Sequence, residues 1–345
     1  MCAMPQAPRD ISELELQLST PTAGVVQTLR DIPGDILILG VGGKMGPTLA
    51  RMAQRASELS GRARRVIGVS RFSDDSLRKR LNEWGIETIP CNLLDEQEVA
   101  RLPDAPLVIS MAGFKFGAKA NPSLTWAMNC YMPAILSRRF RDSRIVAFSS
   151  GNVYGLVPVA SGGSVESDTP RPVGEYAMTV LGRERMFDYF SRELNIPMVL
   201  LRLNYATELR YGVLVDLGRK VWNEEPIDLS MSHVNVIWQT EANAMSLQSL
   251  AAVSTPPRIL NIAGGEILRI QDVANRFAEI MDRRVKFTGE ESGSALLNNA
   301  SESHRRFGAP QIPAEQMIQW TADWIRLGGA SLNKPTHFES RDGRF

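Results

Sequence analysis

A segment near the start of the chain has the residue types and the spacing of a phosphate-binding turn. The apolar run Ile36–Leu39 is followed at once by glycines, three of which recur at every third position. Such a run is typical of a buried parallel strand, and the glycines suit a tight turn that brings backbone N–H groups close to a phosphate. A helix beginning there would direct the positive end of its dipole at a dinucleotide pyrophosphate, although an ordinary glycine-rich loop is the alternative. The residues of this predicted site are Gly40, Gly43, Lys44, Met45 and Gly46.

Further candidate cofactor contacts stand where later apolar runs end. Ser70 occupies the place at which an enzyme that uses NAD usually carries an acidic residue for the ribose, and Arg71 follows it. Because a guanidinium suits a ribose 2′-phosphate and a bare hydroxyl does not need one, we predict NADP in preference to NAD; a solvated surface arginine is the alternative. The predicted contacts to the adenine and the ribose after the next two runs are Asn92, Leu93, Met111, Ala112 and Gly113, the last three of which a plain strand-ending turn explains nearly as well.

The most specific pattern lies in the segment Phe148–Gly155, which reads Phe-Ser-Ser-Gly-Asn-Val-Tyr-Gly, and in Tyr176 downstream. Together with the glycine triplet and the turn Leu260–Gly265, it closely resembles the extended short-chain dehydrogenase/reductase family, also called the NAD-dependent epimerase/dehydratase family. The resemblance covers roughly residues 34–327. Several motifs in one order are specific, whereas a lone glycine triplet is a weak signal.

This resemblance implies a catalytic pair. Ser150 matches the serine whose hydroxyl holds the substrate oxygen, and Tyr176 matches the tyrosine that exchanges a proton while hydride moves to or from the nicotinamide. A phenol has an unperturbed pKa of about 10, so it must be partly ionised to act as a base near neutrality. A serine that only caps a turn and a tyrosine that only packs are the alternatives. By the same resemblance, further residues near the cofactor are Asn129, Leu203, Asn204 and Tyr205.

The chain departs from the family pattern four residues after the tyrosine, where Val180 stands in place of the lysine that lowers the phenol's pKa in the family. Three explanations are open. Lys115 or Lys119 approaches the substrate from another loop, Tyr176 acts only as a neutral acid or hydrogen-bond donor, or the site binds cofactor without turnover. For Lys115 and Lys119, a solvated surface lysine is the alternative. The usual acidic residue of the substrate side is also replaced, around Gln239.

We therefore expect an NAD(P)-dependent oxidoreductase, epimerase or dehydratase that acts on a hydroxyl or carbonyl carbon of a sugar-like or nucleotide-sugar substrate. The alternative is a catalytically degenerate dinucleotide-binding sensor or scaffold. Possible anchors for a substrate phosphate or carboxylate are Arg210, Arg219 and Arg269, each of which also suits an ordinary surface arginine. By family analogy, the helices expected over residues 123–138 and 176–194 pair between subunits, which implies a homodimer.

The elements that must position these residues alternate along the chain. Strands are predicted over residues 36–39, 66–70, 87–90, 107–110, 144–149, 198–202 and 258–262, and helices over 47–59, 74–84, 123–138 and 176–194. This alternation predicts an α/β protein with a Rossmann-type doubly wound parallel sheet and a smaller C-terminal substrate-binding region. The later helices are predicted over 241–252, 270–281 and 314–327.

Four regions are expected. An N-terminal preface covers residues 1–33, a dinucleotide-binding domain 34–204, a mainly substrate-binding region 205–327, and a polar tail 328–345. In the preface, Leu14, Leu16 and Leu18 alternate with polar residues, which predicts an extended segment before a helix that starts near Thr22. A disordered end and a subunit contact are both open for the tail.

Composition excludes several classes. The net charge of +1 and the absence of basic stretches interleaved with aromatic residues argue against a nucleic-acid partner. The three cysteines and three histidines lack ligand spacing, so we expect neither a metal nor a disulfide framework. No stretch approaches the roughly 18–20 apolar residues that cross a bilayer, and the start lacks a basic segment followed by an apolar one, so we expect a cytoplasmic protein without a membrane partner.

Overall fold

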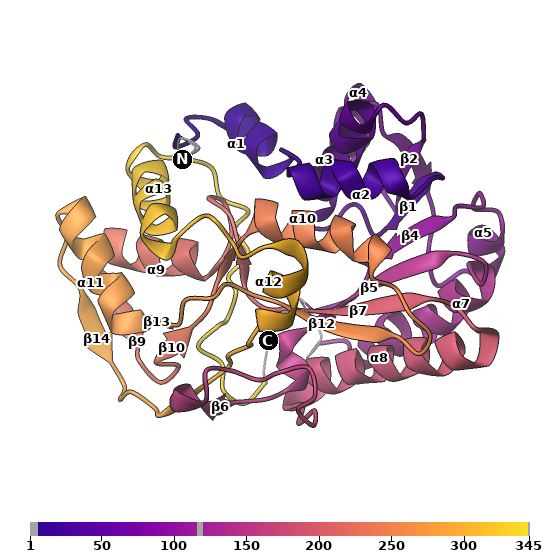
Figure 1. Ribbon diagram of the computed structural model, residues 1–345. Coiled ribbons are helices and arrows are strands. Elements are labelled where there is room, and N and C mark those ends of the chain that lie inside the picture. Colours follow the sequence, from indigo (N-terminus) through magenta and orange to yellow (C-terminus); the bar gives the residue numbers. More distant parts are fainter. Residues whose placement is uncertain (1–5, 116–119, 344–345) are drawn as a thin grey trace.

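The structure, a computed structural model, describes residues 6–115 and 120–343, so Lys119 lies outside the described residues. A seven-stranded sheet forms its centre, in the order β12-β7-β5-β4-β1-β2-β3 (Figure 1). Its strands are β1 (Ile36–Leu39), β2 (Val66–Ser70), β3 (Glu87–Pro90), β4 (Leu107–Ser110), β5 (Arg144–Ser150), β7 (Met198–Leu203) and β12 (Arg258–Ile262). Every neighbouring pair is parallel. The Rossmann-type sheet predicted from the alternation is confirmed, and its strand order reverses between β1 and β4, where open α/β sheets bind ligands.

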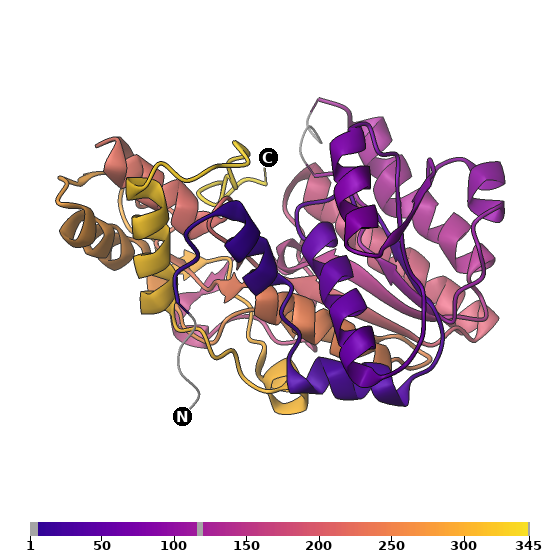
Figure 2. The same cartoon turned by 90° about the horizontal axis from the view of Figure 1, so that it is seen from above.

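Helices cover both faces of this sheet (Figures 1 and 2). On one face, α2 (Ala23–Asp31), α3 (Gly46–Ser60) and α10 (Gln239–Gln248) pack against one another. On the other lie α5 (Glu96–Ala100), α7 (Met132–Arg139) and α8 (Gly174–Leu194). Side chains of β1 alternate between the two layers, so the strand is apolar throughout its length. The helix α4 (Asp75–Glu83) connects β2 to β3.

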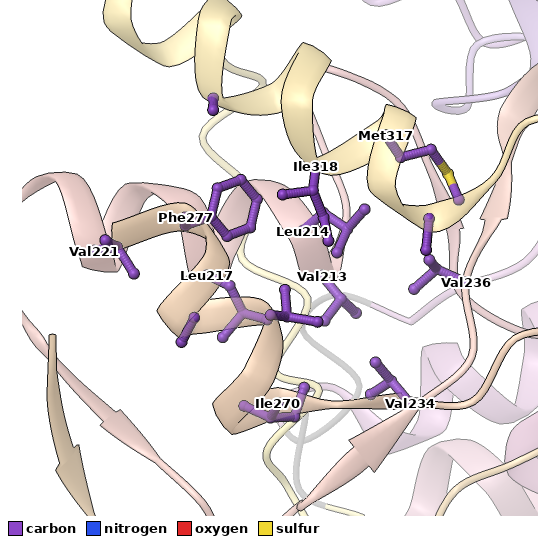
Figure 3. Packing of buried hydrophobic residues seen from close by; sticks show 14 of the residues in the cluster. Val213, Leu214, Leu217, Val221, Val234, Val236, Ile270, Phe277, Met317 and Ile318 are labelled. Atoms are coloured by element: carbon purple, nitrogen blue, oxygen red, sulfur yellow. The ribbon is translucent and has the colours of Figure 1, made fainter. Parts of the chain in front are cut away.

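A smaller C-terminal region stands beside the sheet and is built around three helices, α9 (Val213–Trp222), α11 (Ile270–Met281) and α13 (Ala314–Arg326). Figure 3 shows Leu214 and Leu217 of α9 beside Phe277 of α11 and Ile318 of α13. The remaining elements are α12 (Ser301–Phe307) and the short strands β6 (Val157–Pro158), β8 (Ala206–Thr207), β9 (Pro226–Asp228), β10 (His233–Val234), β11 (Ile237–Trp238), β13 (Leu268–Arg269), β14 (Lys286–Thr288) and β15 (Ser294–Ala295).

The extended segment predicted in the preface is wrong, because a helix, α1 (Ile11–Leu18), stands there. The Asp10 carboxylate caps it by accepting a hydrogen bond of 2.8 Å from the Glu13 N–H. Leu14 and Leu18, one helical turn apart, are buried against the C-terminal region, whereas Leu16 is exposed. The alternation of leucines therefore contained a four-residue helical period.

The single helix predicted over residues 123–138 is interrupted. It consists of α6 (Pro122–Trp126), a π-helical turn η1 (Ala127–Tyr131) and α7. Pro133 has no N–H to donate to the carbonyl of Asn129, and a π-turn accommodates such a gap in the helical hydrogen bonds. The turn carries Asn129 into the interior, where its side chain is fully buried.

The described part of the tail packs on the chain itself. The N–H and the hydroxyl of Thr336 donate to Asp216 Oδ2 at 2.8 and 2.6 Å, and Phe338 is buried. Arg341 Nη1 donates to the carbonyls of Ser230 and Ser294, each at 2.8 Å. The tail through Gly343 is therefore not a disordered end, while a subunit contact remains a prediction.

No helix within residues 6–115 and 120–343 combines the length and the apolar character that crossing a membrane requires.

Candidate functional site

The glycine turn after β1 contains positions at which only glycine fits. Gly40 has a φ of +87°, and a Cβ on it would lie 2.6 Å from the backbone nitrogen of Ala112. A Cβ on Gly46, where α3 begins, would overlap the carbonyl of Val41. Because the first N–H groups of a helix have no acceptor within it, the start of α3 offers donors to an anion at this turn.

A cavity of about 390 Å³ opens at the carboxyl ends of β1, β4, β5 and β7. It is lined by the predicted catalytic pair, Ser150 and Tyr176, which come from the end of β5 and the first turn of α8. The predicted cofactor residues that line it are Gly40, Gly43, Lys44, Met45, Gly46, Met111, Gly113, Leu203, Asn204 and Tyr205. The fold thus brings together residues that are up to about 165 positions apart in the sequence.

Other predicted cofactor residues lie away from this cavity. Arg71 and Asn92 line a separate cavity of about 520 Å³, together with Arg101 and Glu98. There the N–H of Asn92 donates to Glu98 Oε2 at 2.6 Å. Three further predicted contacts belong to neither lining among the described residues: Ser70, Leu93 and Ala112.

Asn129 is also placed outside the cavity lining, because its side chain is engaged within the protein. Its Oδ1 accepts hydrogen bonds from the Phe114 N–H at 3.0 Å and from Arg183 Nη2. Its Nδ2 donates to the Phe114 carbonyl at 3.1 Å and to Thr179 Oγ1 at 2.9 Å. These contacts occupy both lone pairs of the oxygen and both hydrogens of the nitrogen, so Asn129 fixes the loop after β4 and Arg183.

The predicted catalytic pair shares the cavity, with Ser150 close enough to Tyr176 to affect the pKa of its phenol. The Ser150 hydroxyl donates to Asn152 Oδ1 at 2.8 Å, which orients it at the end of β5. Burial raises the pKa of Tyr176, while the positive charge of Arg183 and the interaction with Ser150 lower it, and the balance leaves it above its ordinary value. The phenol is therefore protonated near neutrality in the ligand-free protein.

Val180, at which the sequence pattern predicted the loss of the family's lysine, does not line the cavity. Val180 is fully buried and packs in an apolar cluster with Val153 and Tyr154. Arg183, which the sequence pattern did not single out, does line the cavity and donates from Nη1 to the Phe148 carbonyl at 3.0 Å. Its spacing of seven residues from Tyr176, two helical turns, is the signal that could have revealed it.

Three lysines from separate elements also line the cavity. Lys44 lies in the glycine turn, with its Nζ 3.1 Å from the centroid of the Tyr211 ring. Lys115, in the loop after β4, has its Nζ 5.5 Å from the centroid of the Tyr176 ring. Lys334 comes from the C-terminal tail, which carried no local signal of a site. Burial and the charges of Lys115 and Lys334 lower the pKa of Lys44 to about 6, and burial lowers that of Lys115 to about 8.

The arginines considered as substrate anchors have protein partners instead. Arg210 bonds to Glu208 and Glu15, Arg219 donates to the Gly329 carbonyl, and Arg269 pairs with Glu291 and Asp272. Gln239, near which the resemblance predicted the replacement of an acidic residue, lines the cavity and donates to Thr48 Oγ1 at 2.9 Å.

Known proteins resemble this chain in fold. The UDP-glucuronic acid 4-epimerase of Bacillus cereus, in complex with UDP-glucuronic acid and NAD, superposes with a TM-score of 0.70 at 16% identity, over 85% of this chain and 99% of that one. The UDP-glucose 4-epimerase of Thermus thermophilus in complex with NAD gives 0.69 at 17% identity, over 85% and 99%. The dTDP-glucose 4,6-dehydratase of Streptomyces venezuelae with NAD bound gives 0.71 at 16% identity, over 85% and 97%.

A search of curated proteins finds no match. The model of the NAD dependent epimerase/dehydratase family, by contrast, matches residues 36–206. This part of the chain contains the glycine turn, Ser150 and Tyr176. Residues 36–206, about half of the chain, are therefore similar to the NAD dependent epimerase/dehydratase family.

Proposed function

We propose that this protein is an NAD(P)-dependent oxidoreductase of the epimerase or dehydratase type, acting on a hydroxyl or carbonyl carbon of a nucleotide-sugar substrate. The observation that carries the proposal is the single cavity in which the glycine turn, Ser150 and Tyr176 meet. A bound nicotinamide dinucleotide would supply the hydride acceptor or donor. The family match and the similar fold of sugar-nucleotide epimerases and a dehydratase support this reaction class.

The residues present fit a dinucleotide. The turn at Gly40 and Gly46 forms a cradle that a Cβ would fill, and the start of α3 directs backbone donors toward it. Gly43, Lys44 and Met45 would hold the pyrophosphate, and Leu203, Asn204 and Tyr205 would lie along the nicotinamide side of the cavity.

We assign proton transfer to Ser150 and Tyr176, which line the same cavity. Ser150 would hold the substrate oxygen, since its hydroxyl is oriented by Asn152, and Tyr176 would take or give the proton at its phenolic oxygen. Because its pKa lies above the ordinary value, Tyr176 is protonated near neutrality, so it is in the form that can donate a proton, although it donates less readily than an ordinary phenol, and little phenolate is present to act as a base. The direction in which Tyr176 acts as an acid is therefore favoured unless bound ligands lower its pKa.

The substrate or the cofactor is expected to present negative charge to the cavity. Lys44, Lys115 and Lys334 converge there from three elements, and like charges in one cavity repel unless an anion joins them. A diphosphate and a sugar carboxylate both meet this requirement. Nucleotide sugars carry a diphosphate, and nucleotide-linked uronic acids carry a diphosphate and a carboxylate.

We further propose a preference for NADP over NAD through Arg71. Arg71 is exposed beside Arg101 and Asn92, and no hydrogen bond or ion pair to another described residue occupies it. A guanidinium without a carboxylate partner is suited to a 2′-phosphate. The structurally similar epimerases and the dehydratase hold NAD, so the preference rests on this arginine alone.

A homodimer is proposed as well. Exposed large side chains gather on α6, η1 and α8, the helices expected to pair between subunits. They are Trp126, Tyr131, Met178 and Tyr189. A second copy packed against these helices would bury this apolar surface.

The test is turnover of a panel of UDP- and dTDP-sugars with NADP⁺ or NAD⁺, the oxidised forms that accept hydride from a hydroxyl carbon, comparing the wild type with Tyr176→Phe. Tyr189→Phe, on the exposed side of the same helix, is the matched control. We expect turnover that Tyr176→Phe lowers by about 100-fold or more and that Tyr189→Phe leaves unchanged. Tight dinucleotide binding with no Tyr176-dependent turnover across the panel would instead support the second candidate, a dinucleotide-binding sensor, which the burial of Val180 favours.

A further inference from the structure

We propose that Arg183 is a positioning residue that supplies the positive charge beside Tyr176 which the family's lysine would have supplied from position 180. The proposal rests on the proposed function, because it concerns the group that moves the proton. It assigns a role to a residue outside the family pattern and explains how the chain can keep Tyr176 while carrying Val180.

The helix geometry brings the two side chains together. Residues seven positions apart lie on nearly the same face of an α-helix, about 10.5 Å apart along its axis. Side chains on a helix lean toward its N-terminus, so the long side chain of Arg183 extends back toward the turn that carries Tyr176. Val180 lies between them in the sequence and packs inward with Val153. The positive charge therefore comes from Arg183, about one turn further along the helix.

The surroundings of Arg183 hold its guanidinium in place at considerable cost. Its side chain is only 6% exposed, and its contacts are the Phe148 carbonyl and Asn129 Oδ1. Room for it exists because residue 113 is glycine, since a Cβ there would overlap Nη2. Burying a cation at a fixed place lowers the stability of the folded protein. Such groups are common at functional sites.

The charge of Arg183 is not cancelled by a carboxylate at hydrogen-bond distance among the described residues. The adjacent Glu184 is used elsewhere, because both of its oxygens accept from Arg202, at 2.9 and 2.8 Å. The acceptors of Arg183 are neutral oxygens, so its field acts on the cavity and on the phenol. Its Nε has no partner in the described part of the chain.

Titratable or polar groups face Tyr176 from several elements packed around it. Arg183 comes from α8 itself and Ser150 from β5, Lys115 faces the ring from the loop after β4, and Tyr211 approaches from the segment before α9. The charge of Arg183 lowers the pKa of Tyr176 against the effect of burial. Lys115 is the competing source of charge, and it titrates at a pKa of about 8, whereas an arginine stays charged at every accessible pH.

The experiment is a direct titration of Tyr176, which requires no turnover. Ultraviolet absorbance is followed against pH, and the signal of Tyr176 is taken as the difference between each protein and the same protein carrying Tyr176→Phe. The variants are Arg183→Lys, Arg183→Gln, Arg183→Met and Lys115→Met. Circular dichroism and thermal unfolding establish that each variant is folded.

We expect Arg183→Gln to lower the phenolate fraction of Tyr176 at a given pH at least about tenfold, with Arg183→Lys retaining most of it. Arg183→Met, whose apolar side chain needs no buried hydrogen-bond partner, should lower the phenolate fraction likewise and keeps the test usable if Arg183→Gln is too unstable. A folded Arg183→Gln with an unchanged Tyr176 titration would overturn the proposal, as would a larger effect from Lys115→Met. An altered titration in a protein without turnover would instead reject the proposed function and leave the role of the charge intact.

Discussion

Asn129 and Arg183 are joined by a buried hydrogen bond that links the π-turn η1 to the helix carrying Tyr176. The same asparagine bonds both backbone groups of Phe114, so the loop after β4 and the cation of α8 are held in one network. The position of a charge beside the cavity therefore depends on a residue that does not face the cavity.

Replacing Asn129 with alanine tests this network. The variant would leave the Phe114 N–H and one arm of Arg183 without their partner in the interior, and we expect a loss of about 2–4 kcal/mol of unfolding free energy. Urea unfolding measures it. Asn223→Ala, at an exposed helix end, is the control and should change stability by less than about 0.5 kcal/mol. Equal effects of the two substitutions would contradict the network.

The glycine turn is tested by Gly46→Ala. The new Cβ would overlap the Val41 carbonyl, so the start of α3 must move, and we expect dinucleotide affinity to fall about tenfold or more with a loss of about 1–3 kcal/mol in stability. Fluorescence titration with NADPH and NADH measures the affinity. The matched control is Gly293→Ala, since a Cβ there meets no atom within 4 Å. Unchanged dinucleotide binding by Gly46→Ala would argue against a phosphate site at this turn.

The pKa of Lys44, lowered to about 6, predicts a pH dependence of anion binding. An anion favours the charged ammonium, so binding takes up a proton, and affinity should fall as the pH rises from about 5 to about 7, a range in which Lys115 stays charged. Isothermal titration calorimetry with a nucleotide sugar in buffers of different ionisation enthalpy measures the proton uptake. Lys44→Met should bind more weakly and without this dependence. A wild-type affinity that stays constant over the same range would refute the assignment.

Lys44 also makes the stability of the folded protein depend on pH, and the sign is opposite to that of anion binding. The unfolded chain binds a proton at Lys44 up to a pKa of about 10.4, whereas the folded, ligand-free protein releases it near 6, so between these values the unfolded state binds more protons. Lys44 therefore makes the folded protein more stable as the pH rises through that window. Thermal unfolding should show the wild type gaining stability relative to Lys44→Met between about pH 6 and pH 8. A constant difference would contradict the sign.

Arg71→Ala tests cofactor choice. A charge-assisted hydrogen bond to a 2′-phosphate contributes about 1.5–3 kcal/mol, so NADPH binding should weaken about tenfold or more while NADH binding changes little. Paired titrations with both cofactors measure the ratio. Lys79→Ala, an exposed cation on α4, is the control and should leave the ratio unchanged. A wild type that binds NADH more tightly than NADPH would reverse the proposed preference.

The sheet could be predicted from the sequence because each strand is marked by a short local pattern of residues. An apolar run that ends in glycine identifies a buried strand and its turn without knowledge of distant residues, and the strand Ile36–Leu39 has the predicted bounds. In the preface, leucines at two-residue spacing fit both the two-residue period of a strand and the four-residue spacing of a helix, and only the burial of Leu14 and Leu18 decides between them. Asn129 was assigned to the cofactor from the family pattern, but the π-turn carries its side chain to Arg183 and Phe114.

The lining contributed by the tail could not be predicted from local patterns. Lys334 and Thr336 reach the cavity because the chain returns across α9 and Thr336 bonds Asp216, a contact between residues 120 positions apart. Arg183 is an intermediate case, since its spacing from Tyr176 was visible in the sequence. Its approach to the cavity depends on the space left by Gly113, which only the packing reveals.

The most direct measurement is a crystal structure of the protein with a bound nicotinamide dinucleotide. We predict that the pyrophosphate lies against the backbone of Gly43–Gly46 at the start of α3 and that the nicotinamide faces Ser150 and Tyr176. A dinucleotide bound elsewhere, or a glycine turn closed by the protein's own side chains in those crystals, would contradict the account.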